Sequence, residues 1–266
     1  MRPPMPDTPF ALEPGDPAPV EMVDGDPRGS VVLTCEHGGR AVPRALGESA
    51  PPAPEMARHI AWDLGAEATA RQIAARLGAP LVIQRYSRLV IDSNRPRHAP
   101  DLAPATSDGT EIPFNSALDE AGHEARWQAI HAPFHRAVAR LLDDRAGRPT
   151  ALVAVHSFTP RLRGGAARPW HLGLLARTDM ALAEALAEAL GRQAPDALVT
   201  FNEPYRIEDD SDYTIPIHGE ARGLPHVLVE IRNDLICEPE GAARWGMLLA
   251  QSIAEALPRV LATTED

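Results

Sequence analysis

Short apolar runs that alternate with long amphipathic stretches constrain this chain more than any other feature of its sequence. The short runs have the length of strands, and in the longer stretches apolar residues return at three and four positions, the period of a helix. Apolar strands separated by helices are typical of a parallel sheet that is covered on both faces. The sequence therefore predicts an α/β fold, with three α/β/α layers around a mostly parallel, mixed central sheet. The predicted strands are residues 31–35, 81–83, 89–92, 151–156, 171–176, 198–202 and 226–231, and the predicted helices are 55–77, 119–142, 179–190 and 239–261.

The domain organisation follows from length and from the composition of the first residues. Residues 1–28 are rich in Pro, Asp and Gly and show no apolar period, so we expect an irregular lead-in. A chain of 266 residues is long enough for a sizeable core, and α/β enzymes of this size are commonly one unit. We therefore expect a single domain over residues 29–266.

Charge and cysteine content narrow the range of partners. The net charge is -11, and all 26 basic residues are arginines scattered among acids, so nucleic acid is not an expected partner. No apolar run approaches the roughly 18 residues of a membrane helix, so no membrane partner is expected. Cys35 and Cys237 form no disulfide framework, and the first ten residues lack the apolar stretch of a secretory signal. We expect free thiols and a cytoplasmic location.

Unusual polar residues stand at the ends of the predicted strands. His37, Asn94 with Arg95, His156 and Glu230 each lie at, or just after, the last residues of such a strand. In an open α/β sheet the carboxyl ends of parallel strands meet at one edge, where ligands bind. We therefore expect these side chains, distant in sequence, to share one site.

The two histidines suit a metal. Two glycines follow His37 and leave room beside its imidazole, whereas His156 interrupts an apolar strand and needs a polar partner. Alone, either is more simply a strand-end or hydrogen-bonded core histidine, but as a pair at one sheet edge they suit zinc. A third ligand is needed, and Asp63 is favoured over Glu36, because neighbouring strand residues point to opposite faces. Asp63 could instead cap a helix or pair with an arginine.

The remaining polar residues also have two interpretations. Glu230 either forms an ion pair with an arginine or faces the site as a general base. Asn94 and Arg95 either form a simple turn or hold a substrate carboxylate, which a guanidinium binds in a bidentate manner.

Other candidate groups are weaker. His131 and His135 are four residues apart on a predicted helix, but they lack an HExxH context and are expected to pack or to support the site. Ser157 and Cys35 have neither a GxSxG motif nor an oriented triad, so covalent catalysis is a minor alternative.

The chain resembles the N-formylglutamate amidohydrolases, a family whose fold is similar to that of the zinc carboxypeptidases and related phosphorylase/hydrolase-like proteins. The resemblance extends from about residue 30 to about residue 260, and the combination of motifs is more specific than any single one. The motifs are CEHGG (35–39), AWDLGA (61–66), SRLVIDSNRP (87–96), PFH (133–135), VHSFTP (155–160), RPWHLG (168–173), NEPY (202–205), HG (218–219) and VEIRNDLI (229–236).

The resemblance implies roles for particular residues. His37, Asp63 and His156 would be the metal ligands, and Glu230 would be the base. The cofactor implied is zinc, although such ligands accept other divalent ions. Asn94 and Arg95 would hold the substrate carboxylate. The wider carboxypeptidase-like pattern has an acid three residues after the first histidine, a position held by Arg40 in this chain, so the choice between Asp63 and Glu36 stays open.

The implied activity is hydrolysis of the amide bond of a small N-acyl amino acid. N-formyl-L-glutamate is the first candidate substrate, with L-glutamate and formate as products. Two alternatives remain from the sequence: a metal-dependent exopeptidase-like hydrolase, and a non-catalytic protein that binds a small ligand at the same edge of the sheet.

Overall fold

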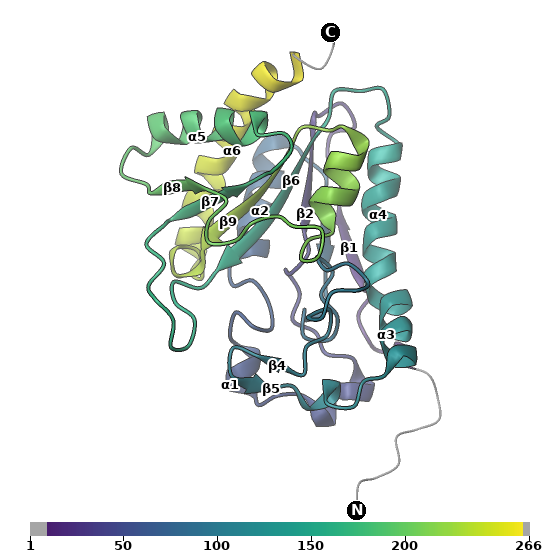
Figure 1. Cartoon of the computed structure of the whole chain (residues 1–266). Helices are drawn as coiled ribbons and strands as arrows, with labels where there is room; N and C mark the ends of the chain where they lie inside the picture. Colours follow the sequence, from purple (N-terminus) through teal and green to yellow (C-terminus); the bar gives the residue numbers. More distant parts are fainter. Residues whose placement is uncertain (1–9, 263–266) are drawn as a thin grey trace, which may run out of the picture.

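A seven-stranded mixed sheet organises the protein, which is described over residues 10–262 by a computed structural model (Figure 1). The strand order is β1-β3-β2-β6-β9-β7-β8. Strand β1 pairs antiparallel with β3, and β7 pairs antiparallel with β9, while the other pairs are parallel. The predicted mostly parallel, mixed sheet is confirmed. The strands are β1 (Val20–Val23), β2 (Val31–Cys35), β3 (Leu81–Gln84), β6 (Ala151–Phe158), β7 (Leu172–Leu175), β8 (Val199–Phe201) and β9 (His226–Arg232).

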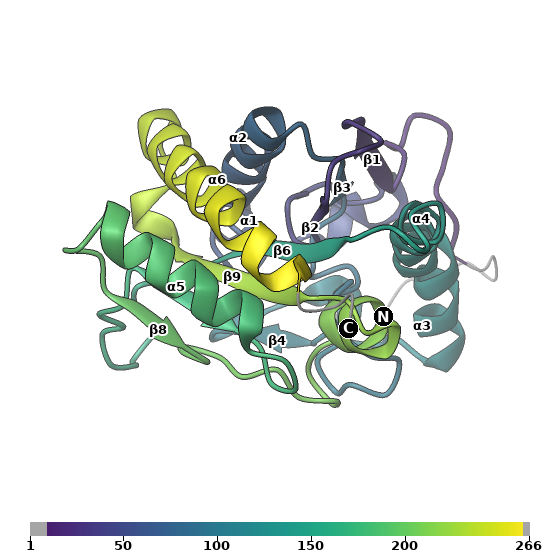
Figure 2. The same cartoon turned by 90° about the horizontal axis from the view of Figure 1, so that it is seen from above.

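Helices cover both faces of this sheet. Figure 2 shows α2, α5 and α6 on one side and α4 on the other. Successive residues of a strand point to opposite faces, so Val153 packs in the cluster under α2, α5 and α6, while Leu152 packs in the cluster under α4. This gives the predicted three layers. The helices are α1 (Ala53–Met56), α2 (Ala66–Leu77), α3 (Glu120–Arg126), α4 (Ala132–Asp143), α5 (Ala181–Gln193) and α6 (Pro239–Leu261), with π-helical turns η3 (Trp127–His131) and η4 (Ile215–Gly219).

A third apolar cluster lies beyond the carboxyl ends of the central strands. Its buried residues come from the segment 60–130. A two-stranded hairpin of the same segment, β4 (Thr106–Ser107) and β5 (Thr110–Glu111), lies next to α1 in Figure 1. Because this cluster anchors the segment, it fixes the polar groups that the segment brings to the end of the sheet. None of the helices within residues 10–262 is both long and apolar enough to cross a membrane.

Two sequence predictions about strands need correction. Residues 20–23 of the lead-in are not irregular but form β1, the antiparallel edge of the sheet. Residues 89–92 are not a strand but a buried turn, in which the Val90 N–H donates to Ser87 O and the Asp92 N–H donates to Leu102 O. The run is apolar because it packs in the third cluster, so its burial has a cause other than sheet formation.

The predicted helix over residues 55–77 is confirmed only for residues 66–77 and is wrong for most of residues 57–65. Helix α1 ends at Met56, turns occupy most of residues 57–65, and α2 begins only at Ala66. Gly65 ends the turns with a φ of 78°, a left-handed conformation that favours glycine, and a Cβ there would lie 2.2 Å from Ile236 O. The interruption places Asp63 in a loop and not on a helix face.

Candidate active site

The register of the central strands brings three polar side chains into one row. Thr34 of β2 pairs with Ala154 of β6, and two residues later the same register places Glu36 beside His156. His156 in turn pairs with Glu230 of β9. All three side chains of the row are buried, on the face of the sheet that α4 covers.

The loop between α1 and α2 brings Asp63 to this row. The Asp63 N–H donates to His37 O at 2.9 Å, which fixes the loop against the residues that follow β2. The carboxylate of Asp63 accepts a hydrogen bond from the Ser157 N–H at 3.2 Å. Asp63 is 2% exposed, so both contacts are shielded from water.

His37, Asp63 and His156 form a compact set of potential metal ligands. Oδ2 of Asp63 lies 3.4 Å from Nδ1 of His37 and 3.0 Å from Nδ1 of His156, and one ligand atom of each residue lies within 4.8 Å of the others. Nδ1 of His37 is buried and makes no hydrogen bond with any residue of the described range 10–262. Two imidazoles and a carboxylate are the ligand types of catalytic zinc sites, so these residues fit such an ion.

Two further carboxylates lie behind the histidines. Nε2 of His37 donates to Oδ1 of Asp92 at 2.6 Å, and Nε2 of His156 lies 2.9 Å from Oε2 of Glu36. Glu36 is thus on the far side of His156 from Asp63. Of the two third ligands that the sequence left open, Asp63 is the one beside both Nδ1 atoms.

The charges of these groups are strongly coupled. Burial alone would raise the pKa of Asp63 and Asp92, but His37 and His156 lower the pKa of Asp63, and Arg88 and His37 lower the pKa of Asp92. Burial would lower the pKa of His156, yet Asp63 and Glu36 hold it well above its usual value. The site therefore keeps its carboxylates ionised, as metal binding requires.

Glu230 has a different environment from the other acids. Burial raises its pKa to about 8, and Oε2 makes no hydrogen bond with the described residues. It lines the same pocket as the two histidines. The predicted alternative of an ion pair with an arginine is not found for Glu230 within residues 10–262. A carboxyl group that gains and loses a proton near neutral pH is suited to general acid and base chemistry.

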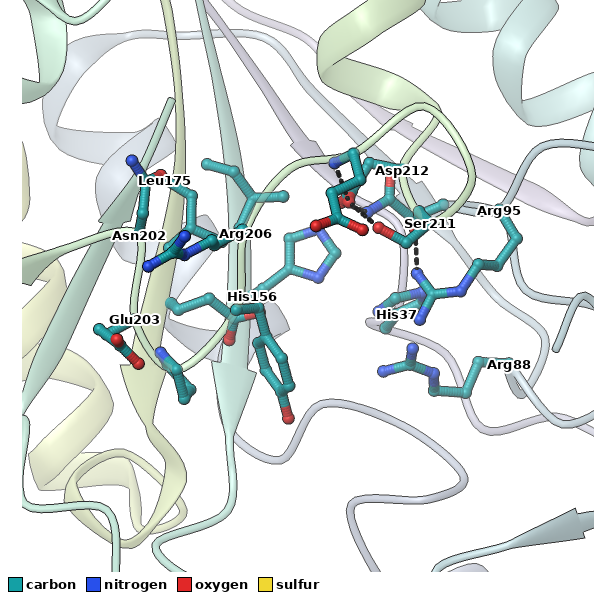
Figure 3. Close-up of a pocket in the computed structure, with 16 residues that line it drawn as sticks. His37, Arg88, Arg95, His156, Leu175, Asn202, Glu203, Arg206, Ser211 and Asp212 are labelled. Carbon is teal, nitrogen blue, oxygen red and sulfur yellow. Dashed lines mark hydrogen bonds between the residues drawn. The ribbon is translucent and has the colours of Figure 1, made fainter. Parts of the chain in front are cut away.

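The pocket is a cavity of about 440 Å³ with charged side chains on two facing walls (Figure 3). Arg88 and Arg95 lie on the side of His37, while Glu203 and Arg206 lie on the opposite side. Arg206 forms no ion pair with the described residues, so its guanidinium is available to a ligand.

The predicted substrate-binding pair, Asn94 and Arg95, lines this pocket, but the two residues differ in their contacts. The amide oxygen of Asn94 accepts from the N–H groups of Tyr213 and Thr214, and Nδ2 donates to Asp212 at 3.0 Å. Asn94 therefore holds the 211–214 segment. Arg95 donates from Nε to Asp101 and from Nη1 to Ser211 O, which leaves Nη2 for a ligand.

Sequence reasoning missed Arg88 and Asp92. The Arg88 guanidinium donates from Nε and Nη2 to Oδ2 of Asp92 at 3.0 and 2.7 Å, and Nη1 lies 3.4 Å from Asp63. Both residues belong to the SRLVIDSNRP motif, so the motif carried the signal. A turn stands where a strand was expected over 89–92, and this turn brings Arg88 to Asp92.

The remaining candidates of the sequence have structural contacts. Nε2 of His131 donates to Arg95 O and Nε2 of His135 donates to Ser93 O, so these histidines support the segment that carries Arg95, as expected. The Ser157 hydroxyl donates to a backbone carbonyl. Cys35 is a free, buried thiol whose pKa is raised by burial, and Cys237 is also free. Neither Ser157 nor Cys35 has the environment of an activated nucleophile.

The chain is similar to proteins of one known family in sequence and in fold. The sequence profile described as FGase, N-formylglutamate amidohydrolase, matches residues 29–237. The crystal structure of gene product Atu2144 from Agrobacterium tumefaciens shares 35% identity, with a TM-score of 0.87 over 97% of this chain and 100% of that chain. N-formylglutamate amidohydrolase from Ralstonia eutropha JMP134 shares 20% identity and the fold, with a TM-score of 0.66 over 93% of this chain and 98% of that chain. No match was found among curated protein sequences.

Proposed function

The chain belongs to the N-formylglutamate amidohydrolase family and is thus a hydrolase that acts on amides, and from this premise we propose that it is a zinc-dependent enzyme for small N-acyl amino acids. N-formyl-L-glutamate is the first candidate substrate, and formate and L-glutamate would be its products. The single observation that carries the proposal is the convergence of His37, Asp63 and His156, two of which line one pocket together with Glu230.

The three ligand residues would hold the metal through Nδ1 of His37, Nδ1 of His156 and the carboxylate of Asp63. When bound, such an ion supplies Lewis acidity, which activates water and polarises a carbonyl group. Three protein ligands leave a coordination position open, as catalytic zinc sites require. The orphaned Nδ1 of His37 supports this assignment, because a buried nitrogen without a partner is costly.

Glu230 would transfer the proton of the reaction. As a carboxylate it takes a proton from the attacking water, and as the acid it gives this proton to the departing amine nitrogen. Its raised pKa, caused by burial, supports both steps, because a group that titrates near neutral pH can serve in either direction. The acyl carbon gains the water oxygen and loses the nitrogen, which gives a free carboxylic acid and an amine.

The arginines of the pocket would recognise the substrate. Arg95 can hold the α-carboxylate with Nη2, and Arg88 lies near enough to the ligand set to stabilise negative charge on the acyl oxygen. Arg206, on the opposite wall, can meet the second carboxylate of a glutamate side chain. This distribution of cations supports a substrate with two carboxylates.

The test combines metal analysis with a substrate panel. We expect about one zinc ion per wild-type chain, and none in a folded His37→Ala/His156→Ala double variant, because two of three ligands are lost. Formyl, acetyl and dipeptide compounds of glutamate and glutamine then identify the leaving acyl group and the side chain preferred. The formyl compound of glutamate should give the highest kcat/KM.

Other outcomes would point to the alternatives. Faster cleavage of dipeptides than of formyl amino acids would indicate an exopeptidase. Absence of metal from the wild type, even after zinc is supplied, would contradict the hydrolytic mechanism and favour a protein that only binds a small ligand.

A further inference from the structure

Glu36 is a buried acid that neither metal binding nor proton transfer uses. It is 1% exposed and follows directly after β2, next to His37. Packing does not explain it, since an apolar residue would fill the same space without the cost of a buried charge. Its carboxylate lies in the row of side chains that the register of β2, β6 and β9 creates, with His156 as its neighbour.

The two histidines of the site each meet a carboxylate on Nε2, the nitrogen away from Asp63. For His37 the carboxylate is Asp92, at 2.6 Å, and for His156 it is Glu36, at 2.9 Å. Both Nδ1 atoms are thereby turned toward Asp63. The protein itself, through these carboxylates, thus determines that Nδ1 of each histidine is the nitrogen available to a metal.

The two carboxylates differ in how their charge is compensated. The second oxygen of Asp92 is bound by the guanidinium of Arg88, which neutralises it. Within residues 10–262, Glu36 forms an ion pair with His156 alone. The hydroxyl groups of Thr34 and Thr214 lie beside it and supply polarity without charge. The negative charge of Glu36 is therefore directed almost wholly at His156.

We propose that Glu36 is the positioning residue of His156. Its carboxylate faces the Nε2–H of the imidazole, selects the tautomer whose Nδ1 lone pair is directed toward Asp63, and strengthens that nitrogen as a ligand through a charge that no arginine of residues 10–262 neutralises. A carboxylate behind a ligating histidine has this effect in metal sites generally. Nε2 of His156 lies 2.9 Å from Oε2 of Glu36, close enough for the negative charge to act directly on the imidazole.

This inference rests on the proposed metal site, and metal affinity tests it without any substrate. The variants are Glu36→Gln, which keeps shape and removes charge, and Glu36→Ala, which removes both. Glu67→Gln is the matched control, because Glu67 lies on α2 outside the pocket, where it is ion-paired with Arg71 of the same helix and with Arg85 after β3. Zinc dissociation constants are measured by competition with a chromophoric chelator, after circular dichroism has shown that each protein is folded.

We expect Glu36→Gln to raise the zinc dissociation constant by about 10- to 100-fold, the usual effect of losing such a partner. Glu67→Gln should stay within twofold of the wild type. If Glu36→Ala does not fold, Glu36→Gln decides alone. A change of threefold or less in Glu36→Gln would overturn the proposal.

Nitrogen-15 NMR of the zinc-loaded proteins supplies a second readout that general loss of stability does not move. In the wild type, we expect the His156 proton on Nε2, with its signal shifted downfield by Glu36. In Glu36→Gln this signal should move upfield, while the His37 signal stays in place because Asp92 is intact. An unchanged His156 signal would also overturn the proposal. Failure of the wild type to bind zinc would instead contradict the metal-dependent function itself.

Discussion

Four buried acids of the site differ in function because their neighbours differ. Asp63 lies between the two histidines and Asp92 is bound by Arg88, so both keep a pKa below the usual value despite burial. Glu36 faces His156, which lowers its pKa against the effect of burial. Glu230 has no comparable partner, and burial dominates its pKa. Environment, and not residue type, separates the proposed ligand and supporting acids from the proposed base.

This difference leads to a prediction for Glu230→Gln. Because Glu230 is not among the ligand atoms, the variant should retain one zinc ion per chain. Its kcat should fall by about 10²- to 10⁴-fold, the usual contribution of a positioned acid or base, with a smaller change in KM. Steady-state kinetics and elemental analysis measure the two quantities, with Glu67→Gln as the control. Near-normal turnover in the zinc-loaded variant would remove Glu230 from the mechanism.

Most residues of the candidate site could be identified from the sequence, whereas the contacts between them could not. His37, His156 and Glu230 were found because polar side chains at the ends of apolar strands are unusual, and parallel strands bring such ends together. Asp63 was favoured over Glu36 because of strand alternation, but the helix expected around Asp63 is interrupted there, so its contacts were not predictable. Arg88 was missed because its contacts depend on a turn over residues 89–92, and the apolar pattern of these residues predicts a strand.

At the scale of elements, the strands of the sheet other than β1 and the helices that cover it were predictable, and the loops beyond the sheet were not. The long helix α6 has the predicted bounds, because its apolar period is set by one sheet face. Residues 57–65 and 87–92 have apolar side chains for a different reason, since they pack against each other in the third cluster. Periodicity detects burial, and these loops are buried without regular structure.

Asn94 and Arg95 are neighbours in one of these loops but have different contacts, so mutation of each should have a different effect. Asn94→Ala removes two acceptor contacts from the 211–214 segment, so we expect a loss of about 1–3 kcal/mol in the free energy of unfolding. Arg95→Leu should instead raise KM at least about tenfold for substrates with a free α-carboxylate. Urea unfolding and steady-state kinetics on both variants separate the two effects.

The amide derivative of the substrate is the control for Arg95. It lacks the carboxylate, so its KM should be similar in the wild type and in Arg95→Leu. An unchanged KM of Arg95→Leu for the substrate with a free α-carboxylate would contradict the anchoring role of Arg95. An unchanged free energy of unfolding of Asn94→Ala would contradict the role of Asn94 in holding the 211–214 segment.

At the scale of the whole molecule, the sheet places its charged site at the ends of its most buried strands. Strands β2, β6 and β9 are central, and nearly all of their side chains are buried. Ligands there are held rigidly, but every charge must be compensated inside the protein. The stability of the metal-free protein should therefore depend on pH through the acid that lacks a compensating partner, Glu230.

The direction of this dependence follows from proton linkage. The carboxyl group of Glu230 has a pKa of about 8 in the folded protein, against 4.5 for the ordinary residue. Between these pH values the folded state holds a proton that the unfolded state releases, so stability falls as pH rises from about 5 to about 8, by up to roughly 1.4 kcal/mol per pH unit. The raised pKa of His156 acts in the same direction, since its stabilising charge is lost at high pH.

Chemical unfolding of the zinc-free protein between pH 5 and pH 8 measures this slope, and Glu230→Gln isolates its cause. The variant cannot ionise at this position, so we expect it to resemble the wild type at pH 5 and to exceed the wild type in free energy of unfolding at pH 8. Any slope that persists in the variant belongs to His156 and the other groups. If the wild type and the variant show equal slopes, burial does not govern the ionisation of Glu230, and its proposed ability to exchange protons near neutral pH loses its physical basis.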